Sequence, residues 1–167
     1  MRNLYAPWRM EYIAGPEQTG CLFCRVLAAP PEEDRANLVV HRGEGAIAML
    51  NKFPYNSGHA MVAPAVHVAS LTDLDDDGTL AVMRLVRHTI RALEAMSHPD
   101  GFNVGVNLGQ VAGAGIPGHV HVHVVPRWGG DTNFMPVLAD VKVVNEHLDR
   151  TWERLVAAFA AADGQRP

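Results

Sequence analysis

The strongest pattern in this chain is the segment Gly118-His119-Val120-His121-Val122-His123-Val124-Val125-Pro126-Arg127. Three histidines occupy every second position, with valines between and after them. Because a β-strand points successive side chains to opposite faces, this alternation predicts a strand with His119, His121 and His123 in a row on one face. The valines then face a hydrophobic core.

Three imidazoles in a row are costly to bury unless each finds a polar partner. Together they offer a nucleophile, proton donors and metal ligands near neutral pH. A histidine-rich exposed face is the plain alternative, but the strict alternation with valine disfavours it. Ring nitrogens at i, i+2 and i+4 of a strand span about 13 Å, which is too long for one metal ion to hold all three. We therefore expect a division of labour among the three rings.

The bulk composition indicates one soluble domain over residues 1–167. Hydrophobic residues make up 48% of the chain and charged residues 19%, which is ordinary for a folded protein. The net charge of -4 gives no basic field for a nucleic-acid polymer. No apolar run reaches the roughly 20 residues of a membrane span, and residues 1–13 lack the apolar core of a secretory signal. We expect a cytoplasmic protein with no membrane contact.

Hydrophobic periodicity and turn residues predict an α+β fold with an antiparallel sheet that carries helices on one side. Residues 1–20 are expected to form an extended arm. Thr72 is expected to cap a helix whose first turn is acidic and which ends before Pro99. A last helix is expected at 138–162. The expected strands are residues 37–41, 45–50, 59–64, 102–108 and the histidine segment.

The two cysteines stand together as Cys21-Leu-Phe-Cys24, directly after a glycine. In a reducing compartment this spacing does not indicate a disulfide framework. Half of a metal site, a redox pair and two thiols packed as small apolar residues all remain open. The glycine-rich loop 109–118 could bring backbone N–H groups to phosphate oxygens, or be a simple turn. It lacks the lysine and hydroxyl pattern of a P-loop.

With these motifs in place, the chain resembles the histidine triad (HIT) superfamily, whose signature is His-x-His-x-His-x-x with apolar x. Residues 51–64 resemble the family's first nucleotide-binding segment. Asn107-Leu-Gly and Ala112-Gly-Ala-Gly115 resemble its phosphate-side loop. Residues 126–134 and 5–13 resemble the bacterial branch related to diadenosine tetraphosphate phosphorylases and hydrolases. The resemblance implies a HIT-like half-barrel with a five-stranded antiparallel sheet, a long central helix and a C-terminal helix, usually paired into a homodimer.

The resemblance also implies roles for individual residues. His121 is the nucleophile that attacks the α-phosphorus of a nucleotide, and His123 contacts the oxygens of the phosphate being cleaved. A carbonyl of the glycine-rich loop is expected to hold His121 in one tautomer. His59 either faces the phosphates or is a satisfied core histidine, and Arg127 either binds a distal phosphate or pairs at the surface. The implied substrate-binding residues are Asn51, His59, Asn107, Gln110, Gly113 and Gly115.

Some triad proteins with an N-terminal Cys-x-x-Cys, and the related uridylyltransferases, bind zinc through two cysteines, a downstream histidine and the first histidine of the triad. The resemblance therefore implies a structural zinc site made of Cys21, Cys24, His67 and His119. A closed site with four protein ligands has no open position, so this zinc would not activate water.

The function implied is a nucleotidyl hydrolase or transferase that cleaves dinucleoside polyphosphates through a nucleotidyl-histidine intermediate. Water and phosphate remain open as acceptors. The alternatives are a nucleoside phosphoramidate hydrolase, a noncatalytic zinc-containing nucleotide-binding protein, and an enzyme with an open metal around the histidine strand. The last would need a carboxylate close to the histidines, and none precedes Asp131 there.

Overall fold

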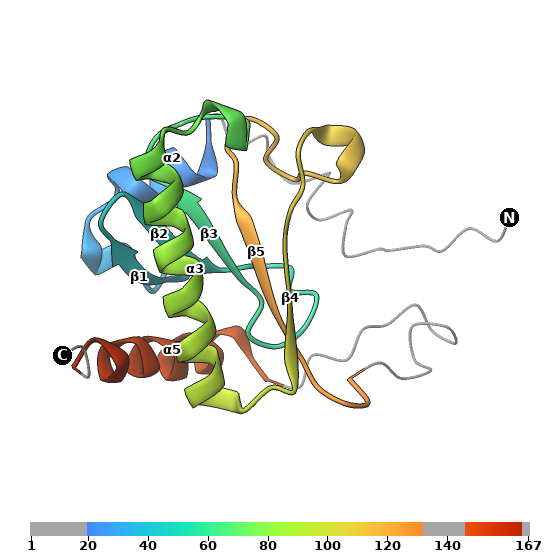
Figure 1. Ribbon diagram of the computed structural model, residues 1–167. Coiled ribbons are helices and arrows are strands. Elements are labelled where there is room, and N and C mark those ends of the chain that lie inside the picture. The colour runs from blue at the N-terminus through green and yellow to red at the C-terminus, as the bar shows by residue number, and fades with distance from the viewer. Residues whose placement is uncertain (1–19, 132–145, 165–167) are drawn as a thin grey trace, which may run out of the picture.

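The computed structural model describes residues 20–131 and 146–164. Within these residues, five strands form one sheet in the order β1-β2-β3-β5-β4, and every neighbouring pair is antiparallel (Figure 1). This confirms the expected α+β class and the five-stranded antiparallel sheet. The strands are β1 Val39–Gly43, β2 Ala46–Leu50, β3 Ala60–Pro64, β4 Gly101–Val106 and β5 Val122–Arg127.

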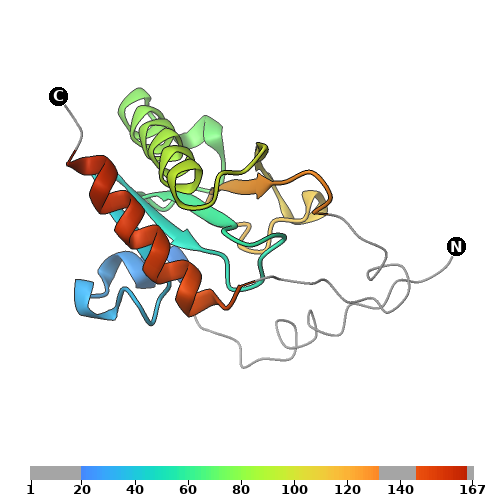
Figure 2. The same ribbon diagram turned by 90° about the horizontal axis from the view of Figure 1, so that it is seen from below.

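The described residues form three α-helices: α2 Leu22–Ala28, α3 Asp76–Ser97 and α5 Leu148–Asp163. Three short 3-10 helices, η1 Pro31–Glu33, η2 Leu71–Asp73 and η3 Gln110–Ala112, lie in the connections. Figure 2 shows α3 on one side of the sheet and α2 on the other. The expectation of helices on one side is therefore correct for the long helices only.

Side-chain alternation along the strands separates the core into two layers. On β2, Ala46, Ala48 and Leu50 pack in the layer that α3 and α5 cover. Ile47 and Met49 point the other way, into a smaller layer with α2. All five residues of β2 are buried, as expected for a strand covered on both faces. We call the side of the sheet that α3 and α5 cover the helix face, and the side that α2 covers the α2 face.

The central helix begins later than the sequence pattern indicated. Asp75, not Thr72, is its N-cap, and its carboxylate Oδ1 accepts a hydrogen bond of 2.7 Å from the Gly78 amide. Thr72 lies in η2, whose cap is Ser70. Leu74 has an extended backbone, which separates the two helices. Asp76 and Asp77 do supply the expected negative charge at the helix N-terminus.

The C-terminal helix also begins later than expected. His147 has an extended backbone and is the N-cap of α5, so Glu146 and His147 are not helical. The expected helical residues 138–145 lie outside the described part of the chain, as does the expected arm apart from Gly20. Leu155 and Phe159, expected on the apolar face, are buried against the sheet. Among the described residues, α2, α3 and α5 are each too short or too polar to cross a bilayer.

Candidate functional site

The histidine segment keeps its predicted alternation, but β5 begins only at Val122. The β3–β5 register, in which Val62 faces Val122, would place Pro64 opposite Val120. Pro64 has no N–H to donate, so the ladder stops there. Val120 instead donates its N–H to the Val68 carbonyl at 2.7 Å.

The rings of the triad lie on the α2 face, where Phe23 packs at 5.0 Å between ring centroids from both His119 and His121. Val122 and Val124 point into the helix-face core. The row of three histidine rings on one side and valines on the other is therefore present, although two of the histidines precede the strand.

His121 is held in a defined tautomer. Its Nδ1–H donates to the backbone carbonyl of His119 at 2.9 Å, and a carbonyl can only accept. Nε2 therefore carries the lone pair. The expected carbonyl from the loop 109–118 is wrong: the partner is the residue that follows the loop. Burial lowers the pKa of His121, which keeps the ring neutral and nucleophilic at neutral pH.

His123 is held in the opposite tautomer by a second histidine. The Tyr55 amide donates to His59 Nδ1 at 3.0 Å, so the proton of neutral His59 is on Nε2. This Nε2–H donates to His123 Nδ1 at 2.9 Å. His123 then carries its own proton on Nε2, a buried atom without a hydrogen-bond partner among the described residues. Unpartnered buried N–H groups are rare in folded proteins and point to a function.

The two Nε2 atoms belong to neighbouring rings. The centroids of His121 and His123 are 4.9 Å apart at an interplanar angle of 67°. Burial, and then the nearby His121, lower the pKa of His123 to about 4. A lone pair and an N–H donor thus stand side by side on neutral rings. His59 itself is fully buried behind His123, which places it as a core histidine in contact with the site.

The loop that follows β4 lies beside this pair. The β4–β5 register pairs Gly105 with His123 and Val106 with Val122, so Asn107 comes one step beyond the ladder, next to His121. Gly109 and Gly113 have φ of 81° and 89°, values that favour glycine. Gln110, Gly113 and Gly115 are exposed in this loop. On the other side of the site, Asn51 Oδ1 accepts from the Phe53 amide at 2.9 Å.

Asp131, for which the sequence indicated no role, connects the loop between β2 and β3 to the end of β5. Asp131 accepts two hydrogen bonds from Arg127, at 2.6 and 2.8 Å, and one from Asn56 at 2.8 Å. Arg127 also donates to Asn103 at 2.7 Å. Arg127 is therefore paired at the surface, the second of its two expected roles. The i,i+4 spacing of Arg127 and Asp131 was the available signal.

Tyr55, also not singled out, lies over the buried pair of rings. It is 49% exposed, and its ring centroid is 4.6 Å from that of His59 and 6.0 Å from that of His123. The aromatic side chain therefore forms part of the outer wall of the site.

The structure brings the four expected metal ligands together. Cys21 Sγ is 3.2 Å and Cys24 Sγ 3.7 Å from His119 Nδ1, and Cys24 Sγ is 3.2 Å from His67 Nδ1. All four ligand atoms lie within 4.8 Å of one another. Zn–S and Zn–N bonds in a tetrahedral site place sulfur and nitrogen about 3.6 Å apart, so the spacing suits zinc.

Neighbouring groups affect the tautomer and the protonation state of two of these ligands, His119 and Cys24. His119 Nε2–H donates to the Pro64 carbonyl at 2.9 Å, which leaves the Nδ1 lone pair directed at the cysteines. Burial lowers the pKa of His119 and keeps it a neutral ligand. Desolvation, then a hydrogen bond with Cys21 and the repulsion between two adjacent thiolates, raise the pKa of the Cys24 thiol. A divalent cation would relieve that repulsion.

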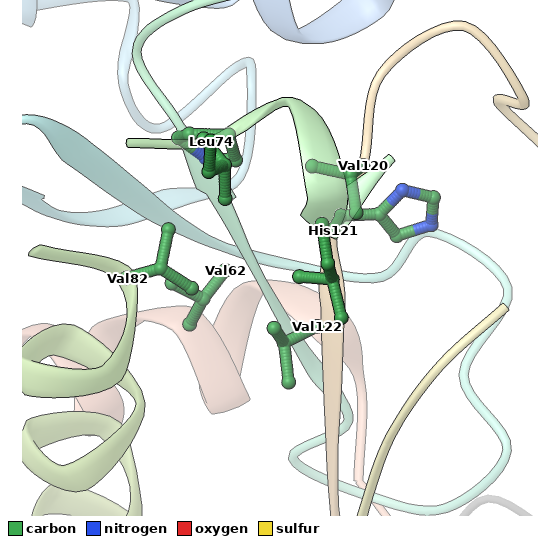
Figure 3. A pocket seen from close by; sticks show the side chains of 8 residues that line it. Val62, Leu74, Val82, Val120, His121 and Val122 are labelled. Carbon is green, nitrogen blue, oxygen red and sulfur yellow. The ribbon is translucent and has the colours of Figure 1, made fainter. Parts of the chain in front are cut away.

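A hollow on the helix face adjoins this site through His121, which is one of its lining residues. It has a volume of about 150 Å³ and an apolar lining that includes Val62, Val82 and Val122. Figure 3 shows the imidazole of His121 directed away from these valines. Ligand pockets generally measure roughly 300–1,000 Å³, so the hollow is too small for a nucleotide.

Comparison with known proteins agrees with the geometry. The HIT domain family model matches residues 32–130. The chain belongs to the HIT family. It is 40% identical over 166 residues to a Mycobacterium tuberculosis protein named AP-4-A phosphorylase, covering 96% of this chain and 85% of that protein. It is also 32% identical over 111 residues to an uncharacterized HIT-like protein of Methanocaldococcus jannaschii, covering 66% of this chain and 81% of the relative.

Solved structures show the same fold. A zinc-bound histidine triad family protein from Mycobacterium smegmatis superposes with a TM-score of 0.70 at 26% identity, covering 88% of this chain and 98% of that one. A uridylyltransferase superposes with a TM-score of 0.67 at 15% identity over 94% of this chain and 51% of that one. The second likeness extends to the fold alone.

Proposed function

We propose that this protein is a nucleotidyl hydrolase or transferase that cleaves dinucleoside polyphosphates at the α-phosphate through a nucleotidyl-histidine intermediate. The observation that carries the proposal is the pair of opposite tautomers, a lone pair on His121 Nε2 beside an N–H on His123 Nε2. The 40% identity to a protein named AP-4-A phosphorylase supports diadenosine tetraphosphate as the substrate.

In the first step, the lone pair of His121 Nε2 attacks the α-phosphorus and forms an N–P bond. The bond from phosphorus to the bridging oxygen breaks, and its electron pair leaves with the polyphosphate of the second nucleotide. His123 Nε2–H donates a hydrogen bond to the oxygen on which this charge develops. As charge grows on His121, the His119 carbonyl that accepts from Nδ1–H stabilises the imidazolium.

In the second step, an acceptor attacks the same phosphorus and the N–P bond breaks, returning the electron pair to His121 Nε2. From diadenosine tetraphosphate, the first step releases ATP and leaves adenylate on His121. Water as the acceptor then gives AMP, whereas inorganic phosphate gives ADP. The name of the Mycobacterium tuberculosis relative supports phosphate.

The loops around the histidine pair supply the groups that would bind the substrate. Asn107 and Gln110 would donate to phosphate oxygens, and the backbone at Gly113 and Gly115 approaches them without side-chain obstruction. Asn51 accepts from the Phe53 amide through Oδ1, so its side-chain NH₂ group would hold a ribose hydroxyl. His59 acts through His123.

We further propose that Cys21, Cys24, His67 and His119 hold one structural zinc ion. Two sulfurs and two nitrogens within 4.8 Å support it, as does the zinc-bound relative of known structure. Bound there, the zinc would fix His119 and so position the carbonyl that orients His121. The ion should remain with His121→Ala and be lost with Cys24→Ala.

The edge strand β4 supports a homodimer, which the resemblance implies. Among the described residues, β4 pairs only with β5, and Val104 on it is 46% exposed. An open edge of this kind is a template for pairing with a second chain. Sedimentation of the protein against a Val104→Lys variant tests this assembly separately from the chemistry.

A trapping experiment tests the mechanism. The protein is mixed with diadenosine tetraphosphate labelled at the α-phosphate, quenched rapidly, and examined for label bound to protein that is labile in acid and stable in alkali. We expect that label in the native protein and none in His121→Ala. A folded native protein that binds nucleotide but never carries label would favour the noncatalytic alternative. The appearance of AMP or ADP, with and without phosphate, identifies the acceptor.

A further inference from the structure

A second cluster of histidines lies on the helix face, opposite the triad. His41 of β1, His88 of α3 and Asp163 at the end of α5 offer ligand atoms that all lie within 4.8 Å of one another. His41 Nδ1 is 3.8 Å from Asp163 Oδ2, and His88 Nε2 is 3.6 Å from Asp163 Oδ1. Three elements far apart in the sequence thus meet at one point.

An irregularity in β1 directs His41 to this point. The register between β1 and β2 shifts between Val39 and His41. Val39 packs in the α2-face layer, whereas Val40 packs in the helix-face layer, and His41 pairs with Ala48, also of that layer. Regular alternation would have returned His41 to the α2 face with Val39. β-bulges are a known device for re-aiming a side chain.

Phe159 of α5 holds both imidazoles in place. The ring of His41 stacks on it at 4.8 Å and 13°, and the ring of His88 meets it edge-on at 4.7 Å and 74°. The side chain of His88 is 7% exposed and that of His41 is 21% exposed. The two rings therefore have little rotational freedom, and ligands fixed in advance bind a metal at a lower entropic cost.

The spacing suits a bridging ion better than direct hydrogen bonds. An N–H···O bond brings its heavy atoms to about 2.7–3.2 Å, and both nitrogen–oxygen distances here are longer. Zinc bonds of about 2.0–2.1 Å to nitrogen and oxygen separate tetrahedral ligands by about 3.3 Å. Each imidazole faces a different carboxylate oxygen, so a small rotation of Asp163, whose side chain is 41% exposed, would close the shell.

We propose that His41, His88 and Asp163 form a second divalent metal site, of the two-histidine, one-carboxylate type that suits zinc and similar transition ions. The exposed side of Asp163 leaves the remaining position to water. Bound metal would fasten the last turn of α5 to β1 and α3. The site lies across the sheet from the nucleotide chemistry and does not depend on it.

Zinc titration of the full-length protein tests the proposal, with Asp163→Asn as the main variant. Asparagine keeps the shape of the side chain but removes its charge. Asp149→Asn, an exposed acid on the same helix, is the matched control. We expect the native protein and Asp149→Asn to bind one more equivalent of zinc than Asp163→Asn, or to bind that equivalent at least about tenfold more tightly. Equal stoichiometry and affinity in all three would overturn the proposal.

Cobalt(II) separates this site from the cysteine site, because thiolate ligands add an intense charge-transfer absorption that nitrogen and oxygen ligands lack. We expect the Cys21→Ser, Cys24→Ser double variant to lose that absorption and still bind one equivalent of cobalt. Should the double variant not fold, the native protein serves: a second equivalent must add ligand-field absorption without the sulfur band. If His41→Gln abolishes the ligand-field absorption that the second equivalent of cobalt adds, the site is supported. If that absorption persists in the variant, the site is refuted.

Discussion

Histidine side chains are positioned by different interactions on the two faces of the sheet. On the α2 face, hydrogen bonds to ring nitrogens set the tautomers: His119 donates to Pro64, His121 to the His119 carbonyl, and His59 to His123. On the helix face, His41 and His88 are positioned through their rings, by packing on Phe159. Control of the nitrogens determines where protons sit, and control of the ring plane determines where lone pairs point. The first suits the proposed proton and phosphoryl chemistry and also orients His119 toward the cysteines, whereas the second fixes ring direction without fixing the tautomer.

The largest expected effect is at the nucleophile. His121→Ala removes the lone pair that attacks the phosphorus in the proposed mechanism, so we expect the rate of nucleotide cleavage to fall by about 10⁴-fold or more. The fold and the zinc content should not change, because His121 is not among the four ligands. Steady-state kinetics with metal analysis of the same samples checks both. A His121→Ala variant that cleaves nucleotide near the native rate would show that His121 is not the nucleophile.

Zinc removal should be the largest stability effect. Cys24→Ser replaces a thiolate ligand by a hydroxyl, and we expect zinc to be lost and the free energy of unfolding to fall by about 3 kcal/mol. Denaturant unfolding in the presence and absence of a chelator measures it. The matched control is Cys24→Ser in chelator against native protein in chelator, which should differ little. A native protein indifferent to the chelator would contradict the zinc assignment.

Acid should destabilise the α2 face through His123. Its pKa is lowered from 6.5 to about 4 by burial and His121, so between these values the unfolded chain binds more protons than the folded one. Stability therefore falls as the pH falls through this window, by about 3 kcal/mol at most. His123→Gln keeps a polar side chain without a titrating ring, and its unfolding free energy should vary less from pH 6.5 to 4. Parallel pH profiles for the two proteins would refute this.

The tautomer of His123 gives a more specific test. His59→Leu removes the N–H donor to His123 Nδ1 and frees the proton to occupy either nitrogen. We expect cleavage to slow by about 10²-fold, whereas His59→Gln, which retains a donor, should recover part of the rate. The pH dependence of the rate should shift with His59→Leu. An equal loss in both variants would indicate a packing role alone.

The sequence predicted what depends on local pattern. Hydrophobic periodicity and turn residues located all five strands, and the valines of the histidine segment pointed to the core as their alternation with histidine indicated. It did not predict that Pro64 ends the β3–β5 ladder, since that follows from the register between strands far apart in the chain. Thr72 and Asp75 are both good N-cap residues, so the sequence could not choose between them. The extended backbone of Leu74 makes Asp75 the N-cap of the central helix.

The sites, like the fold, include features that the sequence predicted and features that only the structure shows. The four cysteine and histidine ligands came from a family resemblance, not from spacing. The tautomer of His123, opposite to that of His121, depends on a hydrogen bond between His59 and His123, which are 64 positions apart. The second cluster rests on a bulge in β1 and on where α5 ends, and neither can be read from local sequence.

The smallest expected effect separates the two faces most clearly. Phe159 is 1% exposed and supports the rings of His41 and His88, so Phe159→Leu should cost about 1–2 kcal/mol of unfolding free energy through the smaller side chain. Nucleotide cleavage should stay at the native rate, since Phe159 packs in the helix-face layer, across the sheet from the triad. If the second metal site is correct, the variant also loses zinc-dependent stabilisation while keeping the zinc held by the cysteines. Thermal unfolding with and without added zinc, in this variant and in Asp163→Asn, distinguishes lost packing from a lost metal. Lost packing lowers the metal-free midpoint in Phe159→Leu alone. Loss of the second metal removes, in both variants, the stabilisation that added zinc gives beyond that of the cysteine site.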